Sequence, residues 1–189
     1  TDTTIHHSSN AYKRRIEGIN GKNLQAINMI NRALNAGIYA DYLLVDSWYA
    51  KPNFINEVKQ NGLDVIARVA KSNKIWQFIG NSKTLESLYN QAKQYKCSKL
   101  GNYNSIKYTY VSAVATHKTL GKIKIVFIKT KDNLIPIIST NTNLSDIEII
   151  NTELILADME SAQKAVLRLA KSAKGGDAKA KEDNTHFSE

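Results

Sequence analysis

The sequence is short of cysteine, long apolar runs and acidic residues, and each shortage excludes a class of protein. Its 189 residues include one cysteine, Cys97, which excludes an internal disulfide framework and a multi-cysteine zinc site. We expect that lone thiol to be buried, as free cysteines usually are. No apolar run approaches the ~20 residues of a membrane span, and no signal peptide is visible. These absences predict a cytoplasmic protein with no membrane partner.

Basic residues outnumber acidic ones by 26 to 17, which gives a formal net charge of +9. Hydrophobic residues make up 42% of the chain, as in folded globular proteins rather than disordered ones. An excess of positive charge suits a polyanionic partner, whether DNA, RNA or an anionic membrane surface. The charge alone does not distinguish among these three.

The first third of the chain predicts a strand–helix–strand unit. Apolar residues recur at steps of three and four over residues 22–36, which predicts an amphipathic helix. The short apolar run 42–45 is typical of a strand that is buried on both faces. Pro52 then opens a helix that Gly62 closes, and an apolar segment over 63–69 follows. This order favours a parallel pair of strands with a helical crossover.

From about residue 70 to 130 the pattern becomes rich in short strands. We predict a strand over 75–79, a helix over 83–95, and an antiparallel hairpin in which 106–110 and 122–127 alternate apolar and polar residues. Gly121 lies in the connection of that hairpin.

The last third predicts one strand and one long helix. Residues 134–139 read as a strand, and Pro136 places it at an edge or beside a bulge. Ser145 and Glu148 fit a capping box that starts a long helix with one apolar stripe. After about Ala173 the composition indicates a disordered tail, 173–189.

Asp46 is the most informative single position, because it follows a buried strand directly. α/β sheets place their sites at the carboxyl ends of strands, although such an aspartate can equally cap a turn. Asp2 is a similar but weaker candidate, because it lies at the very terminus of the sequence. Two carboxylates at neighbouring strand ends can bridge two Mg²⁺ or Mn²⁺ ions for phosphodiester chemistry. His6 and His7 lack partners at metal-ligand spacing, which argues against a histidine site.

Aromatic and basic residues supply a second set of candidates. Trp48 and Tyr49 follow Asp46 closely and can either stack on nucleotide bases or pack in the core. Lysines from Lys118 to Lys131, Lys122 and Lys124 among them, decorate the predicted hairpin. They form either a solvated face or a phosphate-contacting surface. The cluster Lys13, Arg14 and Arg15 is a further candidate for phosphate contact.

Several segments together resemble the DDE transposases of bacterial insertion sequences, which have a ribonuclease-H-like catalytic domain. Asp2-Thr3-Thr4 resembles the segment around the first catalytic aspartate of that family. Leu43 to Tyr49 is similar to the second-aspartate motif, in which a hydrophobic strand ends in Asp, then Ser or Thr, Trp, and Phe or Tyr. Residues 26–42, 62–66, 124–128 and 138–140 resemble the elements around these motifs. The likeness covers roughly residues 1–10 and 12–150.

The resemblance implies a site of three carboxylates, Asp2, Asp46 and Glu160, that holds Mg²⁺ or Mn²⁺. The third should be a glutamate in the pattern Tyr-x2-Arg-x3-Glu-x6-Lys. Ungapped continuation of the register puts it on Glu160, with Lys164 one turn later. The tyrosine, arginine and lysine positions of the pattern hold other residues: Glu153, Leu156 and Leu167. Glu160 also lies opposite the apolar stripe of the predicted helix, where a solvated surface residue is the alternative interpretation.

The resemblance also indicates a truncated or decayed copy, because the family's strands between the first aspartate and the basic cluster are missing. The sheet edge so created would be unpaired and prone to associate. We expect an α/β fold, a ribonuclease-H-like mixed sheet flanked by helices. Its catalytic domain would span 1–172, with a β-rich insertion at about 70–130.

The implied function is metal-dependent DNA cleavage and strand transfer in transposition. Duplex DNA would be the partner, with Lys13, Arg14, Arg15, Trp48, Lys122 and Lys124 as contacts, and homo-oligomers would form by family analogy. A non-catalytic basic nucleic-acid-binding module is the alternative, and a nuclease of the same fold is a third reading.

Overall fold

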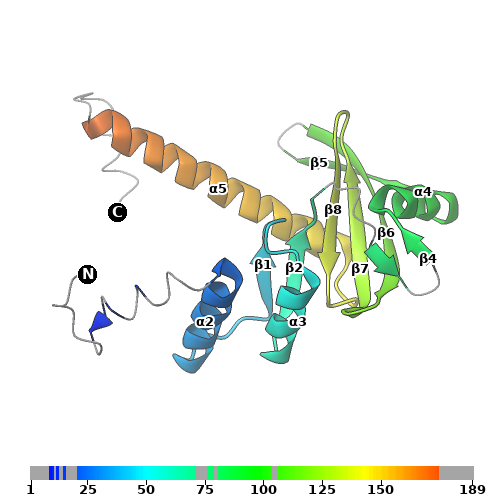
Figure 1. Cartoon of the computed structure of the whole chain (residues 1–189). Coiled ribbons are helices and arrows are strands. Elements are labelled where there is room, and N and C mark those ends of the chain that lie inside the picture. The colour runs from blue at the N-terminus through cyan, green and yellow to red at the C-terminus, as the bar shows by residue number, and fades with distance from the viewer. Residues whose placement is uncertain are drawn as a thin grey trace. The chain divides into compact units, whose positions relative to one another are not determined.

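The computed structural model describes residues 9, 10, 12, 15, 21–70, 76–78, 81–103 and 106–174. The chain divides into two units, Thr1–Asp146 and Ile147–Glu189. Figure 1 shows the elements of the first unit in chain order. They are α2 (Lys22–Asn35), β1 (Tyr42–Val45), α3 (Pro52–Gln60), β2 (Asp64–Arg68), β3 (Trp76–Phe78), β4 (Asn81–Lys83), α4 (Leu85–Tyr95), β5 (Lys99–Tyr103), β6 (Ile106–His117), β7 (Gly121–Lys129) and β8 (Leu134–Ser139).

The strands form one mixed sheet in the order β1-β2-β8-β7-β6-β3-β4, with β5 paired to β6 off this path. Only β1 and β2 run parallel among the described strands, with Leu43 opposite Val65 and Val45 opposite Ala67. Every other described pair is antiparallel. The chain is therefore an α/β protein with an open mixed sheet flanked by helices. The strands expected as an insertion continue this same sheet.

The predicted strand–helix–strand unit is confirmed, and its local signals act as expected. Pro52 occupies the first turn of α3, where its missing N–H costs nothing. Gly37 and Gly62 follow α2 and α3 with φ of 80° and 82°, the left-handed conformation that ends a helix. Since these conformations strain other residues, the two glycines fix where each helix stops.

A large apolar core forms on one face of the sheet and is shared by α2, α3 and α4. Ile27 of α2, Ile55 of α3 and Leu88 of α4 belong to the same buried cluster as Ile125 of β7 and Ile138 of β8. Phe127 lies fully buried in it, and its ring centroid is 5.7 Å from that of Tyr89. Burial of this apolar area is the main stabilising term for the unit.

The expectation that 42–45 is buried on both faces is wrong. Among the described strands, β1 pairs with β2 alone and lies at the edge of the sheet. Val45 is buried, whereas Leu43 and Leu44 are half-buried and Tyr42 is exposed. The apolar run predicted a covering layer on each face of the strand, but Val45 is the one residue of the run that is buried.

Pro136 does not mark an edge strand, because β8 lies between β2 and β7. The β2 ladder ends with Arg68 opposite Ile137, and Val69 N–H then donates to the Pro136 carbonyl at 2.9 Å. A residue in a strand presents its N–H and C=O on the same side. The N–H that proline lacks would therefore face the end of the β2 ladder, so its loss breaks no bond to β7.

Cys97 is exposed, not buried as expected, because it lies in the connection between α4 and β5. The hairpin prediction is confirmed and extended: β6 and β7 pair from Thr109–Lys129 to His117–Gly121. Gly121 has φ of 73° at the end of the turn.

The turn between β6 and β7 is held by the buried ring of His117. Its Nδ1 accepts hydrogen bonds from the N–H groups of Thr119 at 3.1 Å and Leu120 at 3.3 Å. From α3, Lys59 Nζ donates to the Leu120 carbonyl at 3.1 Å. Nδ1 accepts only when it carries no proton, and burial lowers the pKa of His117 below its usual value.

The second unit contains most of α5 (Asp146–Lys174), which confirms the predicted long helix. The expected tail 173–189 lies outside the described residues from position 175 onward. In the part of the chain that the structure describes, no helix has both the length and the apolarity to cross a membrane.

Phe127→Ala should lower the free energy of unfolding by about 3–5 kcal/mol, because it leaves a large cavity in the shared core. Urea unfolding measures this. Val114→Ala on the neighbouring strand is the matched control, since Val114 is 57% exposed and should lose less than about 1 kcal/mol. Equal losses in the two variants would contradict the placement of the core.

Stability should fall as the pH drops below about 6.5, because the unfolded chain then binds a proton at His117 that the folded chain resists. The slope due to this residue is at most about 1.4 kcal/mol per pH unit. His117→Asn is the control, since its side-chain oxygen can accept the same two N–H groups without titrating. Subtracting the pH dependence of this variant's unfolding free energy removes the contribution of the other three histidines. Parallel losses in both proteins from pH 7.5 to 5.5 would contradict the prediction.

Candidate functional site

Asp46 holds the turn by which the chain leaves β1. Its Oδ1 accepts the N–H groups of Trp48 at 2.9 Å and Tyr49 at 3.3 Å, and its carbonyl accepts Tyr49 N–H at 3.2 Å. The residue is exposed, and its Oδ2 has no hydrogen bond to any described residue. Asp46 therefore caps a turn with one carboxylate oxygen and leaves the other oxygen open.

The two aromatic residues after Asp46 point in different directions. The Tyr49 ring lies 5.3 Å from the ring of Phe54, which is 2% exposed, and packs against the core. Trp48 is 45% exposed and meets Tyr49 edge-on at 5.0 Å. Tyr49 thus anchors the turn, while the indole of Trp48 stays accessible to solvent.

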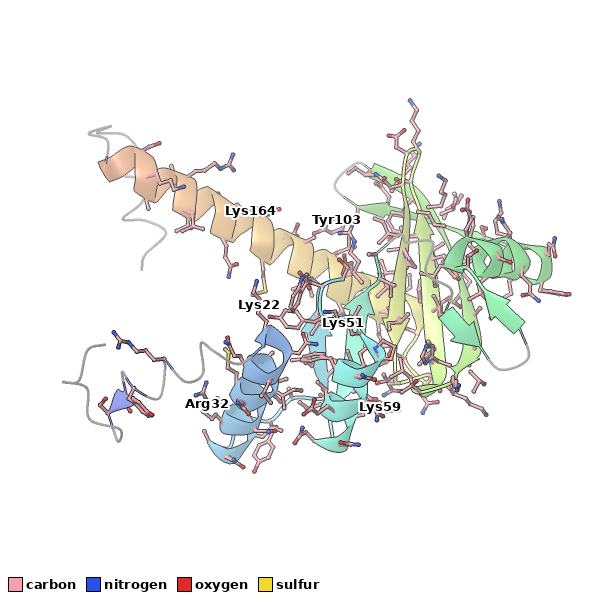
Figure 2. All side chains as sticks on the ribbon, viewed as in Figure 1. Lys22, Arg32, Lys51, Lys59, Tyr103 and Lys164 are labelled. Atoms are coloured by element: carbon pink, nitrogen blue, oxygen red, sulfur yellow. The ribbon has the colours of Figure 1, made fainter. Side chains whose placement is uncertain are left out.

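Two lysines from different helices lie over the indole. Lys51 Nζ is 4.4 Å from the centroid of the Trp48 ring and Lys22 Nζ is 5.3 Å from it, both within cation–π range. Lys51 occupies the N-cap position of α3, and Lys22 is the first residue of α2. Figure 2 labels both lysines at the ends of these helices. We call Trp48, Lys22 and Lys51 the Trp48 cluster.

The Trp48 cluster carries two positively charged side chains. Neither α2 nor α3 carries an acidic residue in its first turn, so the partial positive charge at each helix start is not neutralised there. Among the described residues, neither Lys22 nor Lys51 forms an ion pair. Sequence reasoning selected Trp48 and missed both lysines. The one available signal was Lys51-Pro52, a basic residue directly before a helix start.

Most of the other predicted site residues cannot be placed beside Asp46. Asp2, Lys13 and Arg14 lie outside the described residues, as do His6 and His7. Glu160 belongs to α5 in the second unit, and its side chain is outside the described part. Within the described ranges, no three Asp, Glu, His or Cys side chains gather as a metal-binding group. The three-carboxylate site therefore stays a prediction.

The hairpin lysines differ in whether their charge is free to contact a phosphate group. Lys122 is exposed on β7, as the phosphate-contact hypothesis requires, and Arg15 is exposed as well. Lys124 Nζ instead forms a part-buried ion pair with Asp146 Oδ1 at 2.9 Å. Its charge is therefore engaged within the protein, and we leave Lys124 out of any proposed DNA-binding surface.

The carboxylate of Asp146 is held between Lys124 and a serine. Its Oδ2 accepts the hydroxyl of Ser112 at 3.0 Å. Burial would by itself raise the pKa of Asp146, but the hydrogen bonds from Lys124 and Ser112 and the nearby positive charge outweigh it and lower that pKa. This group is a structural ion pair that fixes the start of α5.

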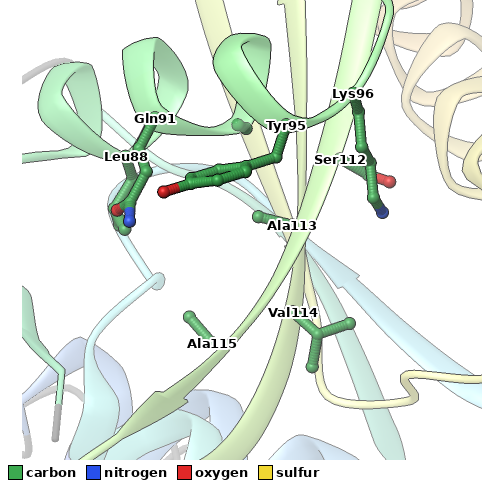
Figure 3. Close-up of a pocket in the computed structure, with 9 residues that line it drawn as sticks. Leu88, Gln91, Tyr95, Lys96, Ser112, Ala113, Val114 and Ala115 are labelled. Atoms are coloured by element: carbon green, nitrogen blue, oxygen red, sulfur yellow. The ribbon is translucent and has the colours of Figure 1, made fainter.

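A separate cavity of about 300 Å³ lies between α4 and β6. In Figure 3 the ring of Tyr95 lies above Ala113, with Gln91 and Lys96 on either side. β2, β8 and β7 separate β6 from β1 in the sheet, so the cavity is distinct from the turn at Asp46. None of the residues predicted to act in catalysis lines it.

Two substitutions test whether Asp46 stabilises the turn through the hydrogen bonds that its Oδ1 accepts. Asp46→Ala removes the acceptor of two N–H bonds and should lower the free energy of unfolding by about 1 kcal/mol. Asp46→Asn keeps a side-chain oxygen at that place and should recover most of the loss. Urea unfolding of the two variants tests this. Equal destabilisation by alanine and asparagine would show that the hydrogen bonds to Oδ1 do not hold the turn.

Comparison with known proteins gives one short similarity. No known family model matches the sequence, and no solved structure matches the chain. Fifty residues are 48% identical to the ribosome-binding ATPase YchF of Escherichia coli O157:H7 and of Haemophilus influenzae, and 46% identical to that of Pasteurella multocida. The similar stretch covers 26% of this chain, and the chain spans only 14% of the length of those relatives. This local similarity does not establish a family.

Proposed function

We propose that the chain carries the ribonuclease-H-like catalytic core of a transposase, which cleaves and joins DNA phosphodiester bonds with Mg²⁺ or Mn²⁺. One observation carries the proposal. Asp46 stands at the carboxyl end of β1 with one open carboxylate oxygen, beside an exposed indole and two lysines without ion-pair partners among the described residues. The carboxyl ends of parallel strands are where α/β sheets place their sites.

The donor chemistry at Asp46 fits a hard divalent cation. Mg²⁺ takes carboxylate oxygens and is held by few protein ligands beside water. By the resemblance, Asp2 and Glu160 would supply the remaining carboxylates. β1 has a free edge among the described strands, and the resemblance predicts that Asp2-Thr3-Thr4 pairs there, beside Asp46. Bound metal would activate the attacking water or hydroxyl and stabilise the leaving oxygen.

The residues of the chain would prepare this chemistry in three ways. The N–H groups of Trp48 and Tyr49 restrict the carboxylate of Asp46 to one orientation. Lys22 and Lys51 supply positive charge for the phosphates next to the cleaved bond. Arg15 and Lys122, with Lys13 and Arg14, would hold the duplex further away. The net charge of +9 supports a polyanionic substrate.

A basic nucleic-acid-binding module without catalysis is the second candidate. It is favoured by the use of Asp46 Oδ1 as a turn cap and by the local similarity to a protein whose name describes ribosome binding. Such a module would bind nucleic acid equally well with and without divalent metal.

Nicking of a supercoiled plasmid that carries matching terminal repeats tests the catalytic proposal. We expect nicking that requires Mg²⁺ or Mn²⁺ and falls at least 100-fold in Asp46→Asn, because the variant keeps the turn but loses the anionic ligand. Mn²⁺ binding, measured calorimetrically, should be lost with it.

Asp41→Asn is the matched control, since Asp41 is exposed at the opposite end of the same strand. It should nick and bind Mn²⁺ as the parent does. Nicking that survives in Asp46→Asn would contradict the proposal. Absence of both nicking and Mn²⁺ binding, with DNA binding intact, would favour the binding module.

A further inference from the structure

Trp48 is an exposed ring on a rigid support. Its indole rests edge-on against Tyr49, and the Tyr49 ring packs on the buried Phe54. The backbone N–H of Trp48 is fixed by Asp46 Oδ1. An aromatic surface that is 45% exposed, yet supported by the Tyr49 ring and by a fixed backbone, loses little conformational entropy when a flat ligand stacks on it.

The two lysines over this ring are held weakly enough to move from the indole to a phosphate group. The cation–π contacts at 4.4 and 5.3 Å attract each ammonium by only about 0.5–1 kcal/mol at an exposed site. A phosphate group attracts an ammonium group at least as strongly as the indole does. A nucleotide base can therefore replace the ammonium group on the face of the indole. A lysine that leaves the ring then remains within reach of the nucleotide's own phosphate.

The ligand that matches an indole flanked by two lysines, neither ion-paired with a described residue, is a nucleotide whose base is not paired. A duplex exposes its phosphates, but its base faces are covered by their neighbours in the stack. An unpaired nucleotide offers both a π face and a phosphate, which is the combination that single-strand-binding surfaces use.

We propose that the Trp48 cluster binds one unpaired DNA nucleotide, with its base stacked on the indole and its phosphate between Lys22 and Lys51. The choice of DNA rests on the proposed function, but the stacking itself needs neither metal nor cleavage. The bound nucleotide would lie beside Asp46, which would place a distorted or frayed strand end at the predicted catalytic carboxylate.

Trp48 fluorescence tests the proposal directly. The chain has two tryptophans, so Trp76→Phe leaves Trp48 as the single reporter. In EDTA, an oligothymidylate should quench its emission saturably and bind at least tenfold more tightly than a blunt duplex of equal length. Inorganic polyphosphate, which carries charge without bases, can move the lysines but cannot stack, so it should quench the emission much less than the oligothymidylate does. Because no metal is present, the result does not depend on whether the chain cleaves DNA.

Substitutions identify the groups that bind. By anisotropy of a labelled oligothymidylate, Trp48→Ala should weaken binding by roughly tenfold or more, since a stacked base contributes about 1–3 kcal/mol. Lys22→Gln and Lys51→Gln should each weaken binding and flatten its dependence on salt. Lys93→Gln is the matched control, because Lys93 lies 5.4 Å from the ring of Tyr89 on α4 and should leave binding unchanged.

Three results would overturn the proposal. The first is equal quenching of Trp48 by polyphosphate and oligothymidylate, which would indicate a simple anion-binding surface. The second is a blunt duplex that binds as tightly as the single strand. The third is unchanged affinity in Trp48→Ala together with unchanged emission in the single-tryptophan protein.

Discussion

The first unit's candidate site depends on one carboxylate oxygen, Asp46 Oδ1, which accepts hydrogen bonds from the N–H groups of Trp48 and Tyr49. These bonds turn the backbone sharply where β1 ends. As a result, Tyr49 enters the core against Phe54, and Trp48 stays outside. The same turn delivers Lys51 to the start of α3, where it reaches the indole. If the backbone left β1 in another direction, Tyr49, Trp48 and Lys51 would no longer lie together.

A turn-capping aspartate and a metal-binding aspartate are usually treated as competing interpretations, but the geometry makes them compatible. A carboxylate has two oxygens and about four acceptor sites. Here Oδ1 is used by the backbone, and Oδ2 has no partner in the described part of the chain. The hydrogen bonds to Oδ1 restrict the rotamers of the Asp46 side chain and so restrict the position of Oδ2. The turn-capping role and the proposed ligand role therefore use different oxygens of one carboxylate.

Local periodicity predicted much of the first unit. α2, α3, β1, β2 and β8 follow from apolar spacing and from Pro52, Gly37 and Gly62, because these signals act within a few residues. β5 was missed, since Lys99–Tyr103 contains glycine and asparagine and becomes a strand only through its long partner β6. The edge position of β1 and the central position of Pro136 depend on which strands are neighbours. A single segment does not carry that information.

The candidate site shows the same limit at the level of side chains. Asp46 and Trp48 stand out in the sequence because they follow a strand directly. Lys22 is 26 residues from Trp48, and only the packing of α2 beside α3 brings its ammonium to the indole. Lys124 is typical of a phosphate-contacting residue until Asp146 is seen beside it. Charge patterns along the sequence indicate a polyanion partner but do not tell which cations are already paired.

A carboxylate at a nucleic-acid site repels the phosphates it is meant to act on. Two unit charges at about 4 Å near a protein surface interact by roughly 4 kcal/mol, so this repulsion is large compared with one stacking contact. A net charge of +9 spread over the whole chain is screened beyond about 8–10 Å and offsets little of it locally. Cations next to the carboxylate are needed instead. Lys22 and Lys51 meet this requirement because Trp48, two residues after Asp46, holds both of them at the end of β1 without neutralising either charge.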